Sequence, residues 1–103
     1  MPLTYIHLVV HGKVQGVFFR KHTAAKGQAL RLRGTVRNCD DGSVEVWAVS
    51  DSAAALSEFQ TWCSRVGSPK SRIDRVVEDS GDFDPANAAL AAAYATNPFG
   101  VLR

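Results

Sequence analysis

Hydrophobic and polar residues along the first eighty positions form patterns that predict four strands. In residues 5–11 the apolar side chains fill one face of an alternating pattern, a period that is typical of a half-buried strand. Residues 43–49 repeat this alternation behind an Asp-Gly pair that favours a hairpin turn. Two further strands are predicted at residues 32–38 and 73–78.

Two segments between these strands favour helices. Residues 19–30 are rich in Lys, Ala, Gln and Leu, which have high helix propensity, although Gly27 weakens this helix by about 1 kcal/mol relative to alanine. A second helix is predicted behind Asp51 and Ser52, which are natural N-cap residues. Its apolar stripe, at spacings of three and four, consists of Leu56, Phe59, Cys63 and Val66.

The order strand, helix, strand, strand, helix, strand predicts an α+β fold, a ferredoxin-like βαββαβ sandwich. The handedness rule for crossovers places both helices on one face of an antiparallel sheet. A C-terminal extension follows, in which an alanine-rich stretch from Asp84 to Tyr94 predicts a short helix. Residues 99–102 are expected to form a short last strand at an edge of the sheet. Residues 1–103 are therefore expected to be a single domain.

Length and composition are typical of a soluble globular protein. The chain has 103 residues, of which 46% are hydrophobic and 21% charged, and this excludes a multidomain enzyme and argues against disorder. No run of about 20 apolar residues is present to span a membrane, and no targeting segment is visible, so a cytoplasmic location is expected. Cys39 and Cys63 are expected to be free thiols, with a single disulfide left open, and their spacing predicts no metal site.

The net charge of +2 hides an asymmetry between the two parts of the chain. Residues 1–37 carry seven Lys and Arg residues and no Asp or Glu, which gives a formal charge of +7. Residues 38–103 carry five basic and ten acidic residues, a formal charge of −5. A basic first part indicates an anionic partner, although a solvated basic helix face would give the same pattern.

The most informative segment joins the first strand to the first helix and reads GKVQGVFFR, residues 12–20. Glycines allow backbone N–H groups to turn inward, and unpaired N–H groups at the start of a helix bind anions. Arg20 adds a permanent charge on a planar fork that matches phosphate oxygens. An ordinary turn with a surface arginine is the alternative. A Walker loop is excluded, because no Gly-Lys-Ser/Thr follows at the required spacing.

A second candidate, Asn38, ends the second predicted strand just before the Asp-Gly turn. A carboxamide donates and accepts hydrogen bonds at once, so its side chain can hold and orient a water molecule. An ordinary turn asparagine is again the alternative. A role in orienting water is favoured over an ordinary turn only when Asn38 and the glycine-containing loop are considered together.

Together the segments resemble the acylphosphatase family. Residues 12–20 are similar, almost residue for residue, to the first signature of that family, and residues 34–44 resemble the second. Residues 62–75 carry a weaker third similarity, so the resemblance covers about residues 5–78. Thr35, Ser50 and Gly27 depart from the usual pattern, as does the long stretch at residues 83–97 before the last strand.

The resemblance implies a small enzyme that hydrolyses the carboxyl–phosphate bond of acyl phosphates without a metal or another cofactor. It implies that the phosphoryl group is cradled by the backbone N–H groups of Gln15, Gly16, Val17, Phe18, Phe19 and Arg20. Arg20 would pair with the phosphoryl oxygens, and Asn38 would orient the attacking water. The expected partners are small-molecule acyl phosphates and inorganic phosphate, with no membrane, and the expected state is a monomer.

Two other functions compete with this one. A single-stranded RNA-binding module of the same fold class would use exposed aromatic residues on the central strands, and the sequence offers Tyr5 and Trp47 there. Because no RNA-binding signature accompanies them, nucleic acid is not the expected partner. A carbamoyl-phosphate-handling domain is the second alternative, but such domains occur within larger hydrogenase-maturation proteins.

Overall fold

The computed structural model describes residues 2–102 of the chain. The predicted order of helices and strands is confirmed, with a third helix and a fifth strand in the C-terminal extension. The elements are β1 (Thr4–Lys13), α1 (Phe19–Ala29), β2 (Arg33–Asn38), β3 (Val44–Ser50), α2 (Ala53–Arg65), β4 (Arg72–Asp82), α3 (Ala88–Ala95) and β5 (Gly100–Val101).

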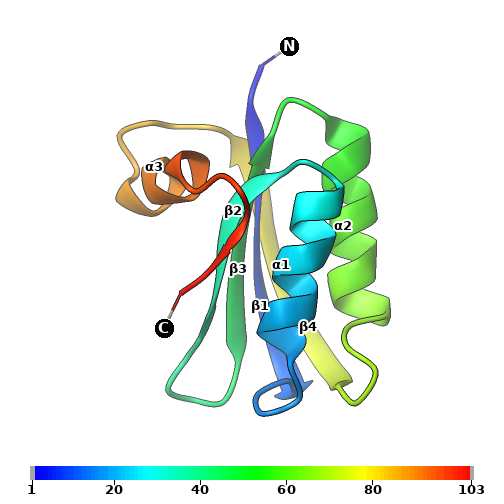
Figure 1. The fold of residues 1–103 in the computed structure, drawn as a ribbon. Coiled ribbons are helices and arrows are strands. Elements are labelled where there is room, and N and C mark those ends of the chain that lie inside the picture. Colours follow the sequence, from blue (N-terminus) through cyan, green and yellow to red (C-terminus); the bar gives the residue numbers. More distant parts are fainter. Residues whose placement is uncertain (1, 103) are drawn as a thin grey trace.

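The strands form one sheet in the order β4-β1-β3-β2-β5. The four long strands are antiparallel, and the short β5 lies parallel to the edge of β2. Helices α1 and α2 lie side by side on one face of this sheet, as predicted, whereas α3 lies on the opposite side (Figure 1). The α+β, ferredoxin-like architecture is therefore confirmed, with α3 as an addition to the outer face.

The main core fills the space between the sheet and the helices α1 and α2. Alternate residues of β1 and β3 point into it, which explains the period of two in the sequence. Its fully buried side chains include Leu8, Val10, Val36, Val44, Val46, Phe19, Phe59 and Cys63. The prediction that Val66 belongs to the apolar stripe of α2 is wrong, because this residue is the C-cap of the helix and is 62% exposed. Cys63 and Cys39 are both free thiols, as predicted.

Strand β4 is longer than the pattern predicted, because it pairs with β1 as far as the Thr4–Asp82 pair. Its second half is exposed and polar, so it carries no hydrophobic alternation for a sequence-based prediction to detect. Backbone hydrogen bonding to a central strand extends it instead. Among residues 2–102, no helix is long and apolar enough to cross a membrane.

Helix α3 covers part of the sheet face that α1 and α2 leave open. Asn87 caps it, since its side-chain oxygen accepts hydrogen bonds from the N–H groups of Ala89 and Leu90, at 3.0 and 3.2 Å. Leu90 and Ala93 form a second buried cluster with Val49, and the side chains of Tyr5, Trp47 and Phe83 pack against it. The alanine-rich extension is thus a short helix, as predicted, and it packs against the outer face.

The extension returns to the main core through Phe99, which is 1% exposed. Its ring lies 5.3 Å from that of Phe59, and it occupies the space where two glycines have no side chain. A Cβ on Gly27 would lie 2.5 Å from the ring, and a Cβ on Gly34 would lie 2.4 Å from it. The departure at Gly27 is therefore explained by packing. This anchor holds β5 beside β2, close to the beginning of α1.

Candidate active site

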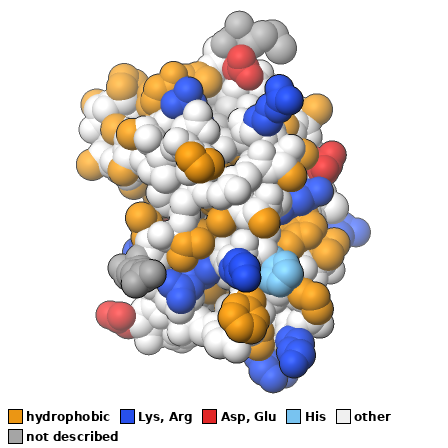
Figure 2. Space-filling model, in the orientation of Figure 1, with side chains coloured by type: hydrophobic (Ala, Val, Ile, Leu, Met, Phe, Trp, Pro, Cys, Tyr) orange, Lys and Arg blue, Asp and Glu red, His pale blue; other side chains and the backbone are white. Residues whose placement is uncertain are grey.

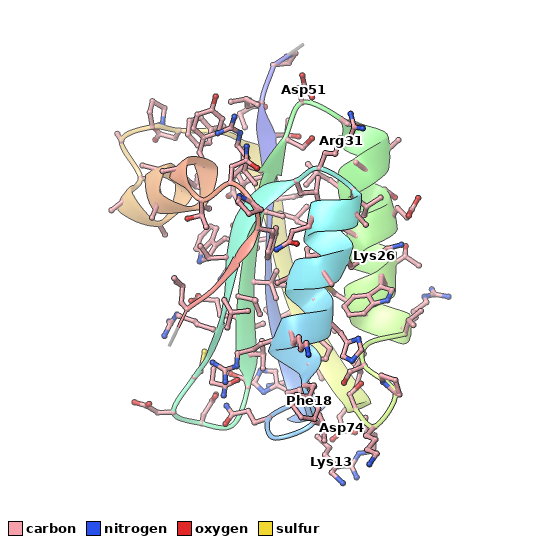
Figure 3. All side chains as sticks on the ribbon, viewed as in Figure 1. Lys13, Phe18, Lys26, Arg31, Asp51 and Asp74 are labelled. Carbon is pink, nitrogen blue, oxygen red and sulfur yellow. The ribbon has the colours of Figure 1, made fainter. Side chains whose placement is uncertain are left out.

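A cleft with a volume of about 280 Å³ lies where the loop after β1 leads into α1. The loop and the first turn of α1 line one side of it, and Asn38 at the end of β2 and Val101 of β5 complete it. Figure 3 labels Phe18 at the foot of α1, where this loop turns into the helix. The two candidate residues Arg20 and Asn38, which are far apart in sequence, line the same cleft.

The loop has a backbone that leaves its N–H groups without partners. Gly16 and Phe18 have positive φ angles of 74° and 59°. Phe18 occupies the N-cap position of α1, and no side chain caps that helix. Within the part of the chain that the structure describes, no group accepts a hydrogen bond from the N–H groups of residues 15–20. Free N–H groups at the positive end of a helix dipole favour an anion.

Ser68, in the loop after α2, supports this backbone from outside. Its hydroxyl is buried and donates a hydrogen bond of 2.9 Å to the carbonyl oxygen of Val17. The carbonyl oxygen of Ser68 in turn accepts hydrogen bonds from the N–H group and the hydroxyl of Ser71, at 3.0 and 2.7 Å. In a trans peptide the C=O and the next N–H point in opposite directions, so this contact turns the Phe18 N–H away from Ser68.

The side chain of Gln15 ties the loop to the turn between β2 and β3. Its amide donates hydrogen bonds of 2.9 Å to the carbonyl oxygens of Cys39 and Ser43. The side chain of Val17 packs into the main core. Neither Gln15 nor Val17 therefore lines the cleft with its side chain, and their predicted contribution to anion binding is limited to backbone N–H groups.

Arg20 lies in the first turn of α1 and contacts the C-terminal segment. Its Nη1 donates a hydrogen bond of 3.1 Å to the carbonyl oxygen of Leu102. The N–H of Leu102 donates in turn to the carbonyl oxygen of Val36, at 2.8 Å. The guanidinium is thus held at the mouth of the cleft by a residue that belongs to neither signature.

Asn38 presents a buried polar atom that lacks a partner. Its Oδ1 is the one buried side-chain nitrogen or oxygen atom in residues 2–102 for which no hydrogen-bond partner is found. A buried acceptor without a donor is costly, of the order of 1–3 kcal/mol, so such atoms usually meet a water or a ligand. Asn38 lines the cleft, and a turn of its carboxamide about the Cβ–Cγ bond would bring this buried oxygen to a water molecule there.

The turn next to Asn38 is fixed by its own side chains. The Asp41 carboxylate accepts hydrogen bonds from the hydroxyl and the N–H group of Ser43. These hydrogen bonds hold the pKa of Asp41 below its ordinary value. Gly42 has a φ of 92°, which the turn requires. The end of β2 is thus held in place before any ligand binds.

The aromatic residues that the RNA-binding alternative requires are occupied by contacts within the protein. The Tyr5 hydroxyl donates a hydrogen bond of 3.0 Å to Asp79, and the Trp47 ring stacks on His7 with 4.0 Å between ring centroids. Both aromatic side chains also pack against the cluster under α3. No group of three or more His, Cys, Asp or Glu side chains that could hold a metal is found in residues 2–102.

Comparisons with known proteins identify the family to which the sequence is related. A family model described as acylphosphatase matches residues 6–87. The chain is 51% identical to acylphosphatase-1 from Xenopus laevis over 67 residues, which cover 65% of this chain and 67% of that protein. It is 40% identical to an acylphosphatase from Yersinia pseudotuberculosis over 79 residues, covering 77% of this chain and 85% of that protein.

Solved structures show the same architecture. An acylphosphatase from Bacillus subtilis superimposes with a TM-score of 0.78 at 26% identity, covering 97% of this chain and 99% of that one. A phosphate- and nucleotide-bound form of full-length HypF matches with a TM-score of 0.75 over all of this chain but only 12% of that protein. At 16% identity, the likeness to HypF indicates a shared fold and nothing more.

Proposed function

The chain belongs to the acylphosphatase family, and from this premise we propose that it hydrolyses acyl phosphates to a carboxylate and inorganic phosphate in the cleft at the start of α1. One observation carries the proposal. One cleft is lined by Arg20, by loop residues whose N–H groups have no partner in the described chain (Gly16, Phe18 and Phe19), and by Asn38, whose Oδ1 has none. An anion and a water molecule would satisfy these three groups together.

The phosphoryl group binds to the loop and to Arg20. The N–H groups of Gln15, Gly16, Val17, Phe18, Phe19 and Arg20 are the donors available for its oxygens. A guanidinium has five N–H donors, so the contact to Leu102 leaves others for the phosphoryl oxygens. Each of these interactions strengthens as negative charge gathers on the phosphoryl oxygens in the transition state.

Asn38 orients the attacking water. Its Oδ1 accepts one hydrogen from the water, which directs a lone pair of the water oxygen toward phosphorus. The new bond forms between the water oxygen and phosphorus, and the bond between phosphorus and the acyl oxygen breaks with its electron pair on the carboxylate. The proton of the water passes to a phosphoryl oxygen. A carboxylate, whose conjugate acid has a pKa of about 4, leaves without a general acid.

Gln15 and Ser68 act as positioning residues in this scheme. Ser68 fixes the Val17–Phe18 peptide, and Gln15 fixes the backbone of the loop relative to the turn that follows Asn38. Both contacts are made before substrate arrives, so the donors need little reorganisation during the reaction. Preorganised donors of this kind are a major source of rate enhancement in enzymes.

The decisive experiment follows benzoyl phosphate hydrolysis by ultraviolet absorbance with a chelator present. We expect turnover by the wild type and a loss of about a thousandfold in Arg20→Ala, since a group that neutralises charge in the transition state is removed. Arg65→Ala is the matched control, because Arg65 carries the same charge in the last turn of α2, outside the cleft. No turnover by a folded wild type, or equal activity in Arg20→Ala, would refute the proposal.

A second variant tests the assignment of the water. Asn38→Ala is expected to lower kcat by about a hundredfold and to leave inhibition by inorganic phosphate nearly unchanged. Asn87→Ala, which removes the cap of α3 on the outer face, is the control and affects stability alone. Equal losses of turnover and phosphate affinity in Asn38→Ala would assign Asn38 to binding or folding instead.

The cellular setting follows from weaker signals. Both cysteines are free, which fits the reducing cytoplasm that the sequence predicts. A monomer is expected, with acyl phosphates and inorganic phosphate as its partners. Sedimentation at several protein concentrations measures the oligomeric state, and a stable dimer would overturn that expectation.

A further inference from the structure

Apolar side chains gather on the rim of the cleft, exposed to solvent. Phe18 is 72% exposed and Val101 is 41% exposed, and both line the cleft. These two are a third of the six large hydrophobic side chains that are exposed in residues 2–102. Figure 2 shows basic and hydrophobic side chains together on the lower part of this face, over the beginning of α1.

Phe18 adopts an unfavourable backbone conformation at the rim of the cleft. Its φ of 59° and ψ of 22° lie in the left-handed region, which bulky residues avoid. It also occupies an N-cap position, where Ser, Thr, Asp or Asn is preferred. Strained backbone conformations of this kind cluster at active sites and ligand-binding sites.

No neighbour uses the Phe18 ring. It stacks on no other aromatic ring in the described chain, and the Lys21 ammonium lies 6.0 Å from its centroid, at the outer limit of a cation–π contact. The ring is therefore free to contact a ligand.

The other side of the rim, formed by β5, is fixed by packing and by backbone hydrogen bonds. Phe99 is buried against Gly27 and Gly34, and β5 pairs with β2 immediately after it. The Leu102 backbone then bonds to Val36 and Arg20. Val101, which lines the cleft, is thus fixed on the strand that completes its wall.

We propose that Phe18 and Val101 form a subsite for the acyl group, which makes the enzyme favour acyl phosphates with an aromatic or large aliphatic acyl group over acetyl phosphate. The inference rests on the proposed function. When the phosphoryl group of a substrate is bound by the loop, the acyl group of that substrate points out of the cleft. Phe18 and Val101 form apolar parts of the lining of the cleft. An apolar acyl group that covers them removes hydrocarbon surface from water on both sides of the contact.

The test compares benzoyl phosphate with acetyl phosphate by the ratio of their kcat/KM values in each variant. We expect this ratio to fall by about three- to tenfold in Phe18→Ala and by about two- to threefold in Val101→Ala. Phe18→Leu, which keeps an apolar side chain, should retain most of it. Val77→Ala is the matched control for Val101→Ala, because Val77 is also exposed, at 53%, but lies on β4 outside the cleft.

The ratio separates this inference from the proposed function. Damage to the phosphate loop lowers both activities and cancels in the ratio. A wild type that hydrolyses neither substrate would refute the proposed function, and the inference with it. If the wild type hydrolyses both substrates, two outcomes would refute the subsite and leave the function intact. In the first, the ratio is the same in all variants, and in the second, it falls in Val77→Ala as well.

Discussion

Helices α1 and α2 cover the same face of the sheet but follow different rules. Ser52 caps α2 by accepting a hydrogen bond of 3.1 Å from the N–H of Ala55, and a regular apolar stripe buries that helix. Helix α1 begins at Phe19, its N-cap residue Phe18 makes no side-chain cap, and Gly27 lies in its interior. A cap contributes about 1 kcal/mol and a glycine in a helix loses about as much, so α1 lacks local stability that α2 has.

The missing cap and Gly27, the two irregular features of α1, both contribute to the structure of the cleft. The missing cap leaves N–H groups available to an anion, and Gly27 leaves room for the ring of Phe99. Phe99 in turn holds β5 at the cleft, where Val101 and the backbone of Leu102 are needed. The loop after α2 supports the start of α1 through Ser68. The regular helix therefore provides stability, and the irregular one carries the site.

After the loss of Arg20, the largest expected effect comes from placing a negative charge at the start of α1. In Phe18→Asp a carboxylate would share the cleft with the phosphoryl group, and two like charges about 4 Å apart repel by roughly 4 kcal/mol near a protein surface. Since part of this repulsion is lost to solvent, we expect kcat/KM for benzoyl phosphate to fall by about a hundredfold.

Ser52→Asp is the matched control for that charge. It adds the same carboxylate at the start of α2, where it keeps the cap and lies outside the cleft. Activity should stay at the wild-type level in this variant. Equal losses in both variants would mean that the start of α1 is not special as an anion site.

The second prediction concerns Gly27, where two effects oppose each other. Helix propensity favours Gly27→Ala by about 1 kcal/mol, but the new Cβ would lie 2.5 Å from the Phe99 ring. Overpacking of this kind costs about 1–3 kcal/mol, and we expect it to prevail. Urea unfolding should show a net destabilisation of about 1–2 kcal/mol.

A double-mutant cycle with Phe99→Leu isolates the contact. Because leucine is smaller, Gly27→Ala should cost much less in that background than in the wild type. A gain of stability from Gly27→Ala alone would show that helix propensity dominates and that the ring of Phe99 moves aside.

The sequence predicted most of the fold because hydrophobic periodicity marks the central strands and α2, and residues of high helix propensity mark α1. It predicted a short helix in the extension but not where that helix packs, because α3 is so rich in alanine that no side of it is distinctly apolar. Gly27 was interpreted as a weakness of α1 because its partner, Phe99, lies 72 positions away in the chain. Packing between distant residues leaves no local pattern.

The candidate site shows the same division. The loop and Asn38 were candidates by residue type, and the resemblance to the acylphosphatase family implied their roles; the structure brings Arg20 and Asn38 to one cleft. The supporting contacts of Ser68 and of the Gln15 side chain were not predicted, because each depends on a carbonyl oxygen from another segment. The only signal for Ser68 was its place in the third stretch of family resemblance, which gave it no role.

The third prediction tests the support that Ser68 gives to the loop. Ser68→Ala leaves the Val17 carbonyl oxygen without its buried donor, so the Val17–Phe18 peptide is no longer fixed. We expect inhibition by inorganic phosphate and the KM for benzoyl phosphate to weaken by about tenfold, equivalent to about 1.4 kcal/mol. Ser71→Ala, which removes a hydroxyl from the same turn without touching the loop, should have little effect. Equal effects of the two variants would assign Ser68 to general stability.

The smallest expected effect is at the cap of α2, and it completes the contrast between the helices. Ser52→Ala removes the acceptor for the Ala55 N–H and should lower the free energy of unfolding by about 1 kcal/mol. Activity per folded molecule should not change, because Ser52 is outside the cleft and α2 contributes no group to it. Thermal unfolding together with benzoyl phosphate hydrolysis measures both quantities. A loss of activity without a loss of stability would mean that α2 shares in the chemistry, and the separation of roles between the helices would be wrong.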